Sequence, residues 1–148
     1  MFARDLMTKP VITCHVNDSV NEVAQRMMDG GVGSLVVVND EGKLTSVITD
    51  RDICMAALTH QRTLDEILVN QAMAKSVVSA RPDSTINEVS ELMATHRVRR
   101  IPIVDADGNP IGVVALDDLV IESVQPDTAL LNGASRVAHT LAAICRPT

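Results

Sequence analysis

The sequence has almost no aromatic side chains. Tryptophan and tyrosine are absent, and Phe2 is the single phenylalanine among 148 residues. Proteins that read single-stranded nucleic acid usually stack bases on aromatic rings, and this chain offers no such platform. Its net charge of -6 also argues against non-specific binding to nucleic acid or to an anionic membrane. We therefore expect neither of these partners.

Long hydrophobic runs are also missing. Apolar stretches such as Leu35 to Val38 are far shorter than the roughly 20 residues needed to span a membrane. Arg4 and Asp5 stand where a signal peptide would need apolar residues. The sequence predicts a cytoplasmic protein without membrane contact.

Candidate catalytic and metal-binding residues are sparse. The cysteines Cys14, Cys54 and Cys145 are odd in number and form no C-x-x-C motif, so we expect neither a disulfide framework nor a zinc site. The four histidines lack metal-ligand spacing, and the sequence contains no P-loop, nucleophile elbow or Ser-His-Asp ordering. We predict no enzymatic activity, no catalytic residue, no bound metal and no required cofactor.

The sequence instead repeats itself after 66 residues without a gap. Residues 7–55 align with residues 73–121, and the matched pairs include Lys9 with Lys75, Val11 with Val77, Met27 with Met93, Val32 with Val98, Gly42 with Gly108 and Asp52 with Asp118. A register held through helices, turns and strands indicates one duplicated supersecondary unit. Anything that the unit binds should then have two related sites, which need not be equal.

Each repeat predicts the order strand, helix, strand, strand, helix. In the first repeat we expect a strand at 11–15, a helix between the capping box of Ser19 and the stop at Gly30 and Gly31, a hairpin of 35–38 with 44–48, and a second helix from about Asp50. The second repeat predicts the same pattern, with a capping box at Thr85, a hairpin of 101–104 with 111–114 and a helix from about Asp117. We expect Thr63 to cap a short connecting helix that runs to Met73, and a final helix after Pro126.

The segment from Ser46 to Asp52 carries the most informative chemistry. It places the Thr49 hydroxyl three residues before the Asp52 carboxylate, across a predicted strand-to-helix junction. A helix N-terminus suits a phosphate, and a carboxylate accepts hydrogen bonds from the hydroxyls of a ribose. Thr-x-x-Asp is also a helix-capping signature, so a purely structural role is an alternative. The two roles can coexist.

Four segments give the chain its family resemblance: Met7 to Thr13, Val47 to Ile53, Val98 to Asp105 and Gly112 to Asp118. With these motifs in both halves, roughly residues 5–124 resemble a CBS domain pair, or Bateman module. The resemblance implies an α/β (α+β) fold, in which two β-α-β-β-α units are related by a pseudo-twofold axis. We expect repeat 1 at 1–62, repeat 2 with the connecting helix at 63–125, and a C-terminal helix at 126–148, forming a stand-alone CBS domain-containing protein.

The same resemblance implies that each ligand site combines the two repeats. The first nucleotide-binding site would comprise Ile48, Thr49, Arg51, Asp52, Lys75, Val77, Val98, Arg99 and Arg100. A weaker second site would comprise Val11, Val32, Gly33, Ser34 and Asp118. Ala115 stands where the family usually has Ser or Thr, which weakens the second site, and Ser46 replaces a family glycine and is expected to crowd the first. For the arginines, a solvated protein edge is the alternative role.

The resemblance implies a regulatory module that binds adenine nucleotides or an adenosyl ligand. The expected ligands are AMP, ADP, ATP or S-adenosylmethionine, and the signal would pass through the shape of a homodimer or through an unknown regulated protein. We expect apolar residues of the second helices, among them Ile53 and Ala56, to contribute to the dimer interface. The alternative is a dimeric interaction or stress scaffold that binds no ligand.

Overall fold

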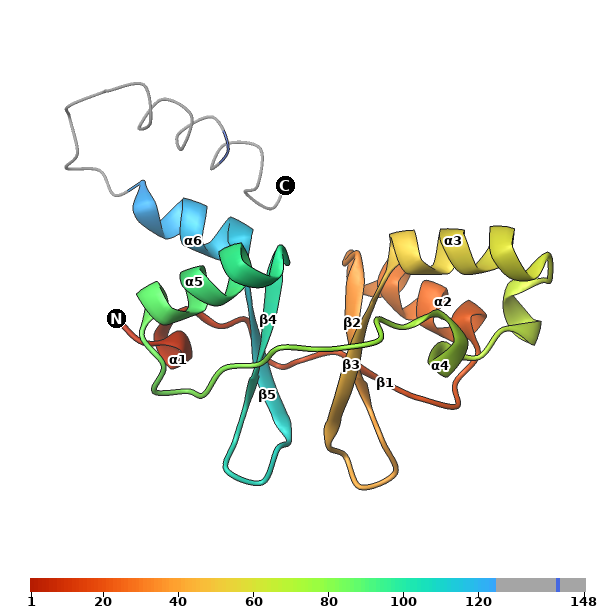
Figure 1. The fold of residues 1–148 in the computed structure, drawn as a ribbon, viewed down its shortest axis with the longest axis horizontal. Coiled ribbons are helices and arrows are strands. Elements are labelled where there is room, and N and C mark those ends of the chain that lie inside the picture. Colours follow the sequence, from red (N-terminus) through yellow and green to blue (C-terminus); the bar gives the residue numbers. More distant parts are fainter. Residues whose placement is uncertain (125–140, 142–148) are drawn as a thin grey trace. The chain divides into compact units, whose positions relative to one another are not determined.

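The computed structural model describes residues 1–124 and Leu141. Along the chain, the described elements are α1 (Ala3–Leu6), β1 (Thr13–His15), α2 (Val20–Gly30), β2 (Ser34–Val38), β3 (Leu44–Thr49), α3 (Asp50–His60), a 3-10 turn (Leu64–Glu66), α4 (Val69–Ala72), α5 (Ile86–His96), β4 (Arg100–Val104), β5 (Pro110–Ala115) and α6 (Leu116–Ser123). Figure 1 shows this order along the ribbon. The mixed α+β fold is confirmed. The predicted helix at 126–148 lies outside the described residues, apart from Leu141.

The chain forms two compact units, and neither is a continuous stretch of sequence. Unit 1 contains residues 1–9, 78–103 and those from 112 on, whereas unit 2 contains residues 10–77 and 104–111. The contacts therefore group the chain differently from a division between residues 62 and 63. That division into sequence repeats remains a prediction.

Unit 2 is built around the sheet β1-β2-β3. Strand β1 runs parallel to β2, and β2 runs antiparallel to β3. Its core gathers apolar side chains from the strands, from α2 and α3 and from the connecting segment, including Val23, Leu35, Ile48, Ile53, Ala56 and Ile67. Ile53 and Ala56 thus belong to this core, so the structure overturns their expected place in a dimer interface.

Helix boundaries follow the predicted capping chemistry. The Ser19 hydroxyl accepts a hydrogen bond from the Glu22 N–H at the start of α2, and Thr85 does the same for Glu88 at the start of α5. Helix α2 ends at Gly30, and the C-cap is Gly31, whose φ of 61° lies in the left-handed region that glycine adopts without strain. Both capping boxes and this stop signal are confirmed.

The N-terminal residues of each repeat pack on the helix of the other repeat. In unit 1, the Ala3 N–H donates to the Ser84 carbonyl, and Phe2 bridges Thr85. In unit 2, Val69 donates to Asp18, and Leu68 bridges Ser19 in the same way. Each of these residues differs by 66 from its counterpart in the other unit. We call residues 1–8 and 67–74 the lead segments.

Two elements differ from the prediction. The segment between Thr63 and Met73 holds a 3-10 turn and the one-turn helix α4, rather than a single connecting helix. Helix α1 has no predicted counterpart, yet its Ala3 is fully buried. Because α1 and α4 are each only four residues long, they carry too little hydrophobic periodicity to be recognised.

The second repeat also lacks its first strand. In the first repeat, the Val36 N–H donates to the Ile12 carbonyl, and β1 pairs with β2. The residue equivalent to Val36 is Pro102, which has no N–H to donate. Only the isolated bridge between Ala80 and Ile103 remains, so the described sheet of unit 1 has two strands, β4 and β5.

Gly112 and Ser46 occupy equivalent strand positions but are packed differently. A Cβ atom on Gly112 would lie 2.5 Å from the Met7 sulfur and 2.8 Å from its Cγ. Ser46 is 1% exposed, and its hydroxyl donates to the Ala74 carbonyl at 2.6 Å. In each unit, the lead segment therefore lies against this strand position. The contact is made by the Met7 side chain in unit 1 and by the hydrogen bond from the Ser46 hydroxyl to Ala74 in unit 2.

This packing predicts that Gly112→Ala destabilises the protein by about 1 to 3 kcal/mol, because the added methyl group overpacks the contact with Met7. Urea denaturation gives the change in free energy of unfolding. Ser46→Ala is the matched control, since it removes one hydrogen bond at the equivalent position without adding an atom. A Gly112→Ala protein as stable as the wild type would contradict the close packing against Met7.

Candidate functional site

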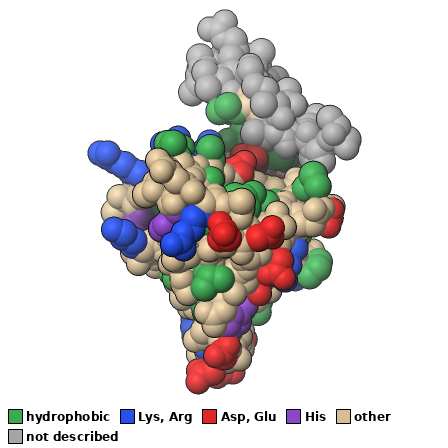
Figure 2. All heavy atoms as spheres, turned by 90° about the vertical axis from the view of Figure 1, so that its right-hand side faces the viewer, with side chains coloured by type: hydrophobic (Ala, Val, Ile, Leu, Met, Phe, Trp, Pro, Cys, Tyr) green, Lys and Arg blue, Asp and Glu red, His purple; other side chains and the backbone are tan. Residues whose placement is uncertain are grey.

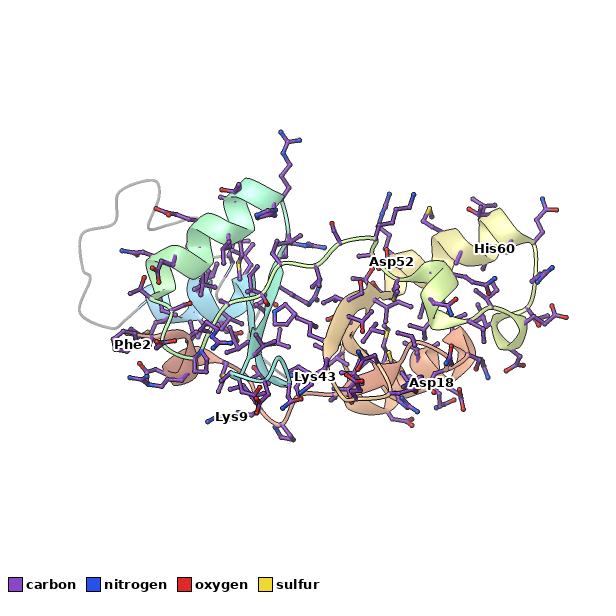
Figure 3. The ribbon with its side chains drawn as sticks, turned by 60° about the horizontal axis from the view of Figure 1, so that its bottom comes forward. Phe2, Lys9, Asp18, Lys43, Asp52 and His60 are labelled. Carbon is purple, nitrogen blue, oxygen red and sulfur yellow. The ribbon has the colours of Figure 1, made fainter. Side chains whose placement is uncertain are left out.

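The start of α3 joins Thr49 and Asp52 in a reciprocal capping box. The Asp52 N–H donates to the Thr49 hydroxyl oxygen at 3.1 Å, and the Thr49 N–H donates to Asp52 Oδ2 at 2.8 Å. Both residues are half-buried, and Figure 3 shows Asp52 at one end of α3 and His60 toward the other. The hydroxyl proton of Thr49 and the second carboxylate oxygen of Asp52 have no partner among the described residues. They remain available for a ligand.

The start of α6 repeats only half of this arrangement. The Ala115 N–H donates to Asp118 Oδ2 at 2.7 Å, but Ala115 has no hydroxyl to cap the helix in return. Burial raises the pKa of the Asp118 carboxyl, and the neighbouring Asp117 charge adds to the rise, against the lowering effect of the Ala115 hydrogen bond. The two helix starts therefore share a carboxylate but differ in hydrogen-bonding capacity and in electrostatics.

The hairpin of each unit places a loop beside its own helix start. In unit 2, Ser34 pairs with Thr49 across the sheet, and the Asp50 N–H donates to the Gly33 carbonyl at 3.0 Å. In unit 1, the Leu116 N–H donates to the Arg99 carbonyl at 2.8 Å. The structure thus brings Gly33 and Ser34 to the start of α3 and Arg99 to the start of α6. The predicted combination of Asp52 with Arg99 joins residues of different units and remains a prediction.

The other predicted site residues differ in exposure. Val32 and Val98, at equivalent positions, are 38% and 37% exposed. Among the charged residues of the predicted sites, Arg51, Lys75 and Arg99 are exposed. Val11, Val77 and Arg100 are half-buried. Ile48 is fully buried in the core of unit 2. Its side chain is enclosed by that core, and its place in the ligand site remains a prediction.

Ser46, which we expected to crowd the first site, has a structural role that the sequence did not indicate. Its side chain is buried and directed to the Ala74 carbonyl, and the Ala74 N–H donates to the Val47 carbonyl at 3.2 Å. The hydroxyl therefore anchors the lead segment of unit 2. This role of Ser46 could not be predicted from the sequence, because the Ala74 carbonyl that accepts its hydrogen bond lies 28 residues away.

A polar cluster at the end of β1 was missed by the sequence analysis. The His15 Nδ1 atom accepts from the Asn17 N–H, and its Nε2 atom lies 2.5 Å from Asp40 Oδ1. Arg26 donates to Asp18 at 2.9 Å. Among the described residues, no group of three potential ligands is placed to hold a metal ion. The cluster ties the end of β1 to the hairpin turn and to α2.

Cys14 lies beside this cluster and is 2% exposed. The pKa of its thiol is raised to about 12, mainly by burial and also by the Asp18 charge, against the lowering effect of Arg26. A thiol with so little thiolate is unreactive. Cys14 is thus a small buried residue of the core, whereas Cys54 is exposed on α3. Cys145 lies outside the described residues.

The unequal caps predict opposite effects of two matched substitutions. Ala115→Thr supplies the missing hydroxyl and should stabilise the protein by about 1 kcal/mol, while Thr49→Ala removes the existing cap and should cost about the same. Thermal denaturation of both variants measures the two effects. A loss of stability in Ala115→Thr would show that the start of α6 has no room for a capping side chain.

The raised pKa of Asp118 predicts a pH-dependent effect. Because the folded pKa lies above the unfolded value, the folded protein binds more protons in the window above the ordinary value of 3.8, and stability falls as pH rises through it. Asp118→Asn abolishes this titration and keeps an acceptor for the Ala115 N–H. The stability of the variant relative to wild type should therefore increase from about pH 4 to about pH 7.

Urea denaturation at a series of pH values gives that difference. Asp117→Asn is a useful control, because it removes one contribution to the rise in the Asp118 pKa and should reduce the effect without abolishing it. A stability difference that stays constant over the whole pH range would contradict the raised pKa.

Comparisons with known proteins agree with this doubled arrangement. The CBS domain model matches residues 3–59 and 66–125. The CBS domain-containing protein YhcV of Bacillus subtilis is 36% identical over 126 residues, covering 85% of this chain and 88% of YhcV. The uncharacterized protein MK0525 of Methanopyrus kandleri is 31% identical over 116 residues, and this chain spans 59% of its length. Inosine-5'-monophosphate dehydrogenase of Methanocaldococcus jannaschii is 34% identical, but the match covers only 24% of that enzyme.

Solved structures agree as well. The CBS domain pair of protein MJ0100, in complex with 5'-methylthioadenosine and S-adenosyl-L-methionine, is 27% identical and has a TM-score of 0.75 over 84% of this chain and 100% of that one. An uncharacterized conserved protein from Pyrococcus horikoshii is 32% identical, with a TM-score of 0.73 over 86% of this chain and 96% of that one. No helix among the described residues is long and apolar enough to cross a membrane. With two tandem matches and a shared fold, the chain belongs to the CBS domain family and contains a CBS domain pair.

Proposed function

We propose that this CBS domain pair is a regulatory module that binds an adenosyl ligand. The observation that carries the proposal is the similarity to the CBS pair of MJ0100, which was solved with 5'-methylthioadenosine and S-adenosyl-L-methionine. At 27% identity over 84% of this chain, the likeness extends beyond a shared fold class. Asp52 and Asp118 each use one carboxylate oxygen to accept a backbone hydrogen bond. The other oxygen of each carboxylate is an acceptor that suits the hydroxyls of a ribose.

The first site of the proposal is centred on Asp52 and Thr49. Thr49 accepts a hydrogen bond from Asp52, so its hydroxyl proton points elsewhere and is free to donate. Capping and ligand binding are therefore compatible functions of the same two residues. We propose that this site is completed by Ile48, Arg51, Lys75, Val77, Val98, Arg99 and Arg100, and that a weaker second site is formed by Val11, Val32, Gly33, Ser34 and Asp118.

The proposal includes no catalysis. Ligand binding would instead change the affinity for a regulated protein or the arrangement of a homodimer. Unit 2 offers an exposed apolar surface on α3 for such a contact, where Met55 is 42% and Leu58 is 70% exposed. Figure 2 shows apolar side chains scattered over one face of the molecule, with Lys and Arg side chains on its left and Asp and Glu side chains on its right and at its lower tip.

A thermal denaturation panel tests ligand binding. It comprises AMP, ADP, ATP, 5'-methylthioadenosine and S-adenosylmethionine, each with the full chain. A ligand present at about 100 times its dissociation constant should stabilise the folded protein by about 2.7 kcal/mol. A panel without any shift would reject the proposal and favour the ligand-free dimeric scaffold.

The unequal helix starts predict that Asp52→Asn weakens binding more than Asp118→Asn does. Asn keeps the cap at both positions, so the comparison isolates the charged acceptor. Loss of a charge-assisted hydrogen bond at Asp52 should cost roughly 1.5 to 3 kcal/mol of binding free energy. Isothermal titration calorimetry measures it, with Asp50→Asn as the control on the same helix. An equal or larger loss at Asp118 would reverse the ranking of the two sites.

A further inference from the structure

A histidine holds the turn between β1 and α2 in unit 2. The His15 Nδ1 atom accepts a hydrogen bond from the Asn17 N–H at 3.1 Å, and the His15 N–H donates to Asp18 Oδ2 at 2.9 Å. The Asp18 N–H donates in return to the His15 carbonyl at 3.0 Å. The turn therefore has three hydrogen bonds to His15, and one of them ends on a ring nitrogen that can be protonated.

The hydrogen bond from Asn17 fixes which nitrogen of the neutral ring carries the proton. A ring nitrogen that accepts a hydrogen bond has no hydrogen of its own, so the proton must be on Nε2. The Nε2 atom is buried, and it lies 2.5 Å from Oδ1 of Asp40 in the turn between β2 and β3. The proton of the neutral His15 ring is thus enclosed beside a carboxylate.

Protonation of the ring has opposite effects on these two contacts. An imidazolium carries a proton on both nitrogens, so Nδ1 becomes a donor and faces the Asn17 N–H, which is also a donor. That hydrogen bond is lost. At Nε2, the contact with Asp40 becomes an ion pair. The charged ring keeps its contact with the β2–β3 turn and loses its contact with Asn17.

The charged groups around the ring come from two turns and one helix. Asp40 lies in the turn between β2 and β3, Asp18 in the turn after β1, and Arg26 on α2, where it is paired with Asp18 at 2.9 Å. The neighbouring Cys14 thiol stays neutral, because its pKa is raised to about 12, mainly by burial. Among the described residues, Asp40 is therefore the carboxylate placed to pair with a protonated His15.

The same turn carries the carbonyl groups that dock the lead segment of unit 2. The Asp18 carbonyl accepts from the Val69 N–H at 2.9 Å, and the Val16 carbonyl accepts from the Asn70 N–H at 3.0 Å. Both acceptors lie within three residues of His15. When the turn loses its hydrogen bond from Asn17, these two carbonyls are held in place by fewer contacts.

The second repeat has the same turn without a histidine. Arg81 and Ser84 stand where the first repeat has His15 and Asp18, and the Arg81 N–H donates to the Ser84 hydroxyl oxygen at 3.1 Å. The carbonyls of this turn dock the lead segment of unit 1 in the same way, with Ser84 accepting from Ala3 and Pro82 from Arg4. Because an arginine stays charged throughout the neutral range, these docking bonds have no equivalent titration.

We propose that His15 is a pH-responsive switch in unit 2, whose protonation breaks the Asn17 hydrogen bond and loosens the docking of Val69 and Asn70. The lead segment continues to Ala74, whose carbonyl accepts from Ser46 on the strand that precedes α3. Acidification thereby acts on the contact that positions this strand. The inference goes beyond the proposed function and does not depend on it, because no ligand takes part.

Backbone amide hydrogen exchange, followed by NMR on the full chain, tests the switch. Each exchange rate is divided by the intrinsic rate at the same pH to give a protection factor. From about pH 7.5 to about pH 5, the range in which histidine ordinarily titrates, the protection of Val69 and Asn70 should fall by roughly three- to tenfold, as for the loss of one hydrogen bond. Ala3 and Arg4, the equivalent amides of unit 1, are the internal control. An equal fall in both pairs, or no fall in either, would overturn the inference.

Two matched substitutions locate the effect. His15→Asn keeps an acceptor for the Asn17 N–H but cannot titrate in this range, so the protection of Val69 and Asn70 should no longer change with pH. His60→Asn removes an exposed histidine at the end of α3 and should leave the wild-type response intact. A pH response that persists in His15→Asn would assign the switch to another group and contradict the inference.

The nitrogen chemical shifts of the His15 ring give a test that needs no substitution. At about pH 7.5 they should show the proton on Nε2 and an unprotonated Nδ1, and at about pH 5 a proton on both nitrogens. A neutral ring with its proton on Nδ1 would rule out the bond from Asn17. A ring that is still neutral at about pH 5 would rule out the switch.

Discussion

The fold depends on backbone hydrogen bonds that fix the lead segment of each repeat to the other repeat. Ala3 donates to Ser84 in unit 1, and Val69 donates to Asp18 in unit 2. These bonds satisfy main-chain groups that a buried segment cannot leave unpaired. They also bring Met7 against Gly112 and Ala74 against Ser46, where each lead segment meets the strand that precedes a candidate ligand-binding helix. The position of that strand, and of the helix start after it, is therefore set by residues far away in the chain.

Within this shared framework, the two repeats have diverged in side-chain chemistry as well as in the first strand, which the second repeat lacks. The start of α3 has a full capping box, whereas α6 has Ala115 and a carboxyl whose pKa is raised by burial. The loops beside these helices differ in charge. The loop of the second repeat carries Arg99 and Arg100, whereas the first repeat has Gly33 and Ser34 at the equivalent positions. Neither repeat holds both the complete cap and the cationic loop. A pair of such units can carry two non-equivalent functions on one duplicated scaffold.

Much of this architecture was predictable because it is local. The 66-residue register, the capping boxes at Ser19 and Thr85 and the stop at Gly31 depend on residues within a few positions of one another, and the structure has all of them. Features that depend on contacts between distant residues could not be predicted from the sequence. The hydroxyl of Ser46 finds its partner 28 residues away, the side chain of Ile48 is enclosed by core residues from several elements, and α1 is stabilised by contacts more than 75 residues along the chain. Pro102 explains why the second repeat lacks its first strand. The explanation also needs the structure, which shows that the equivalent Val36 N–H donates to the Ile12 carbonyl.

The reciprocal placement of the lead segments has an evolutionary implication. A gene that encoded a single repeat would produce a chain whose N-terminal residues needed another copy to dock on, and two identical chains could satisfy every one of these hydrogen bonds by exchanging their N-termini. Gene duplication and fusion would then convert an intermolecular exchange into the intramolecular one seen here. Once the copies were covalently joined, each was free to mutate without altering the other, and an ancestral symmetric protein could acquire a threonine in one half and arginines in the other.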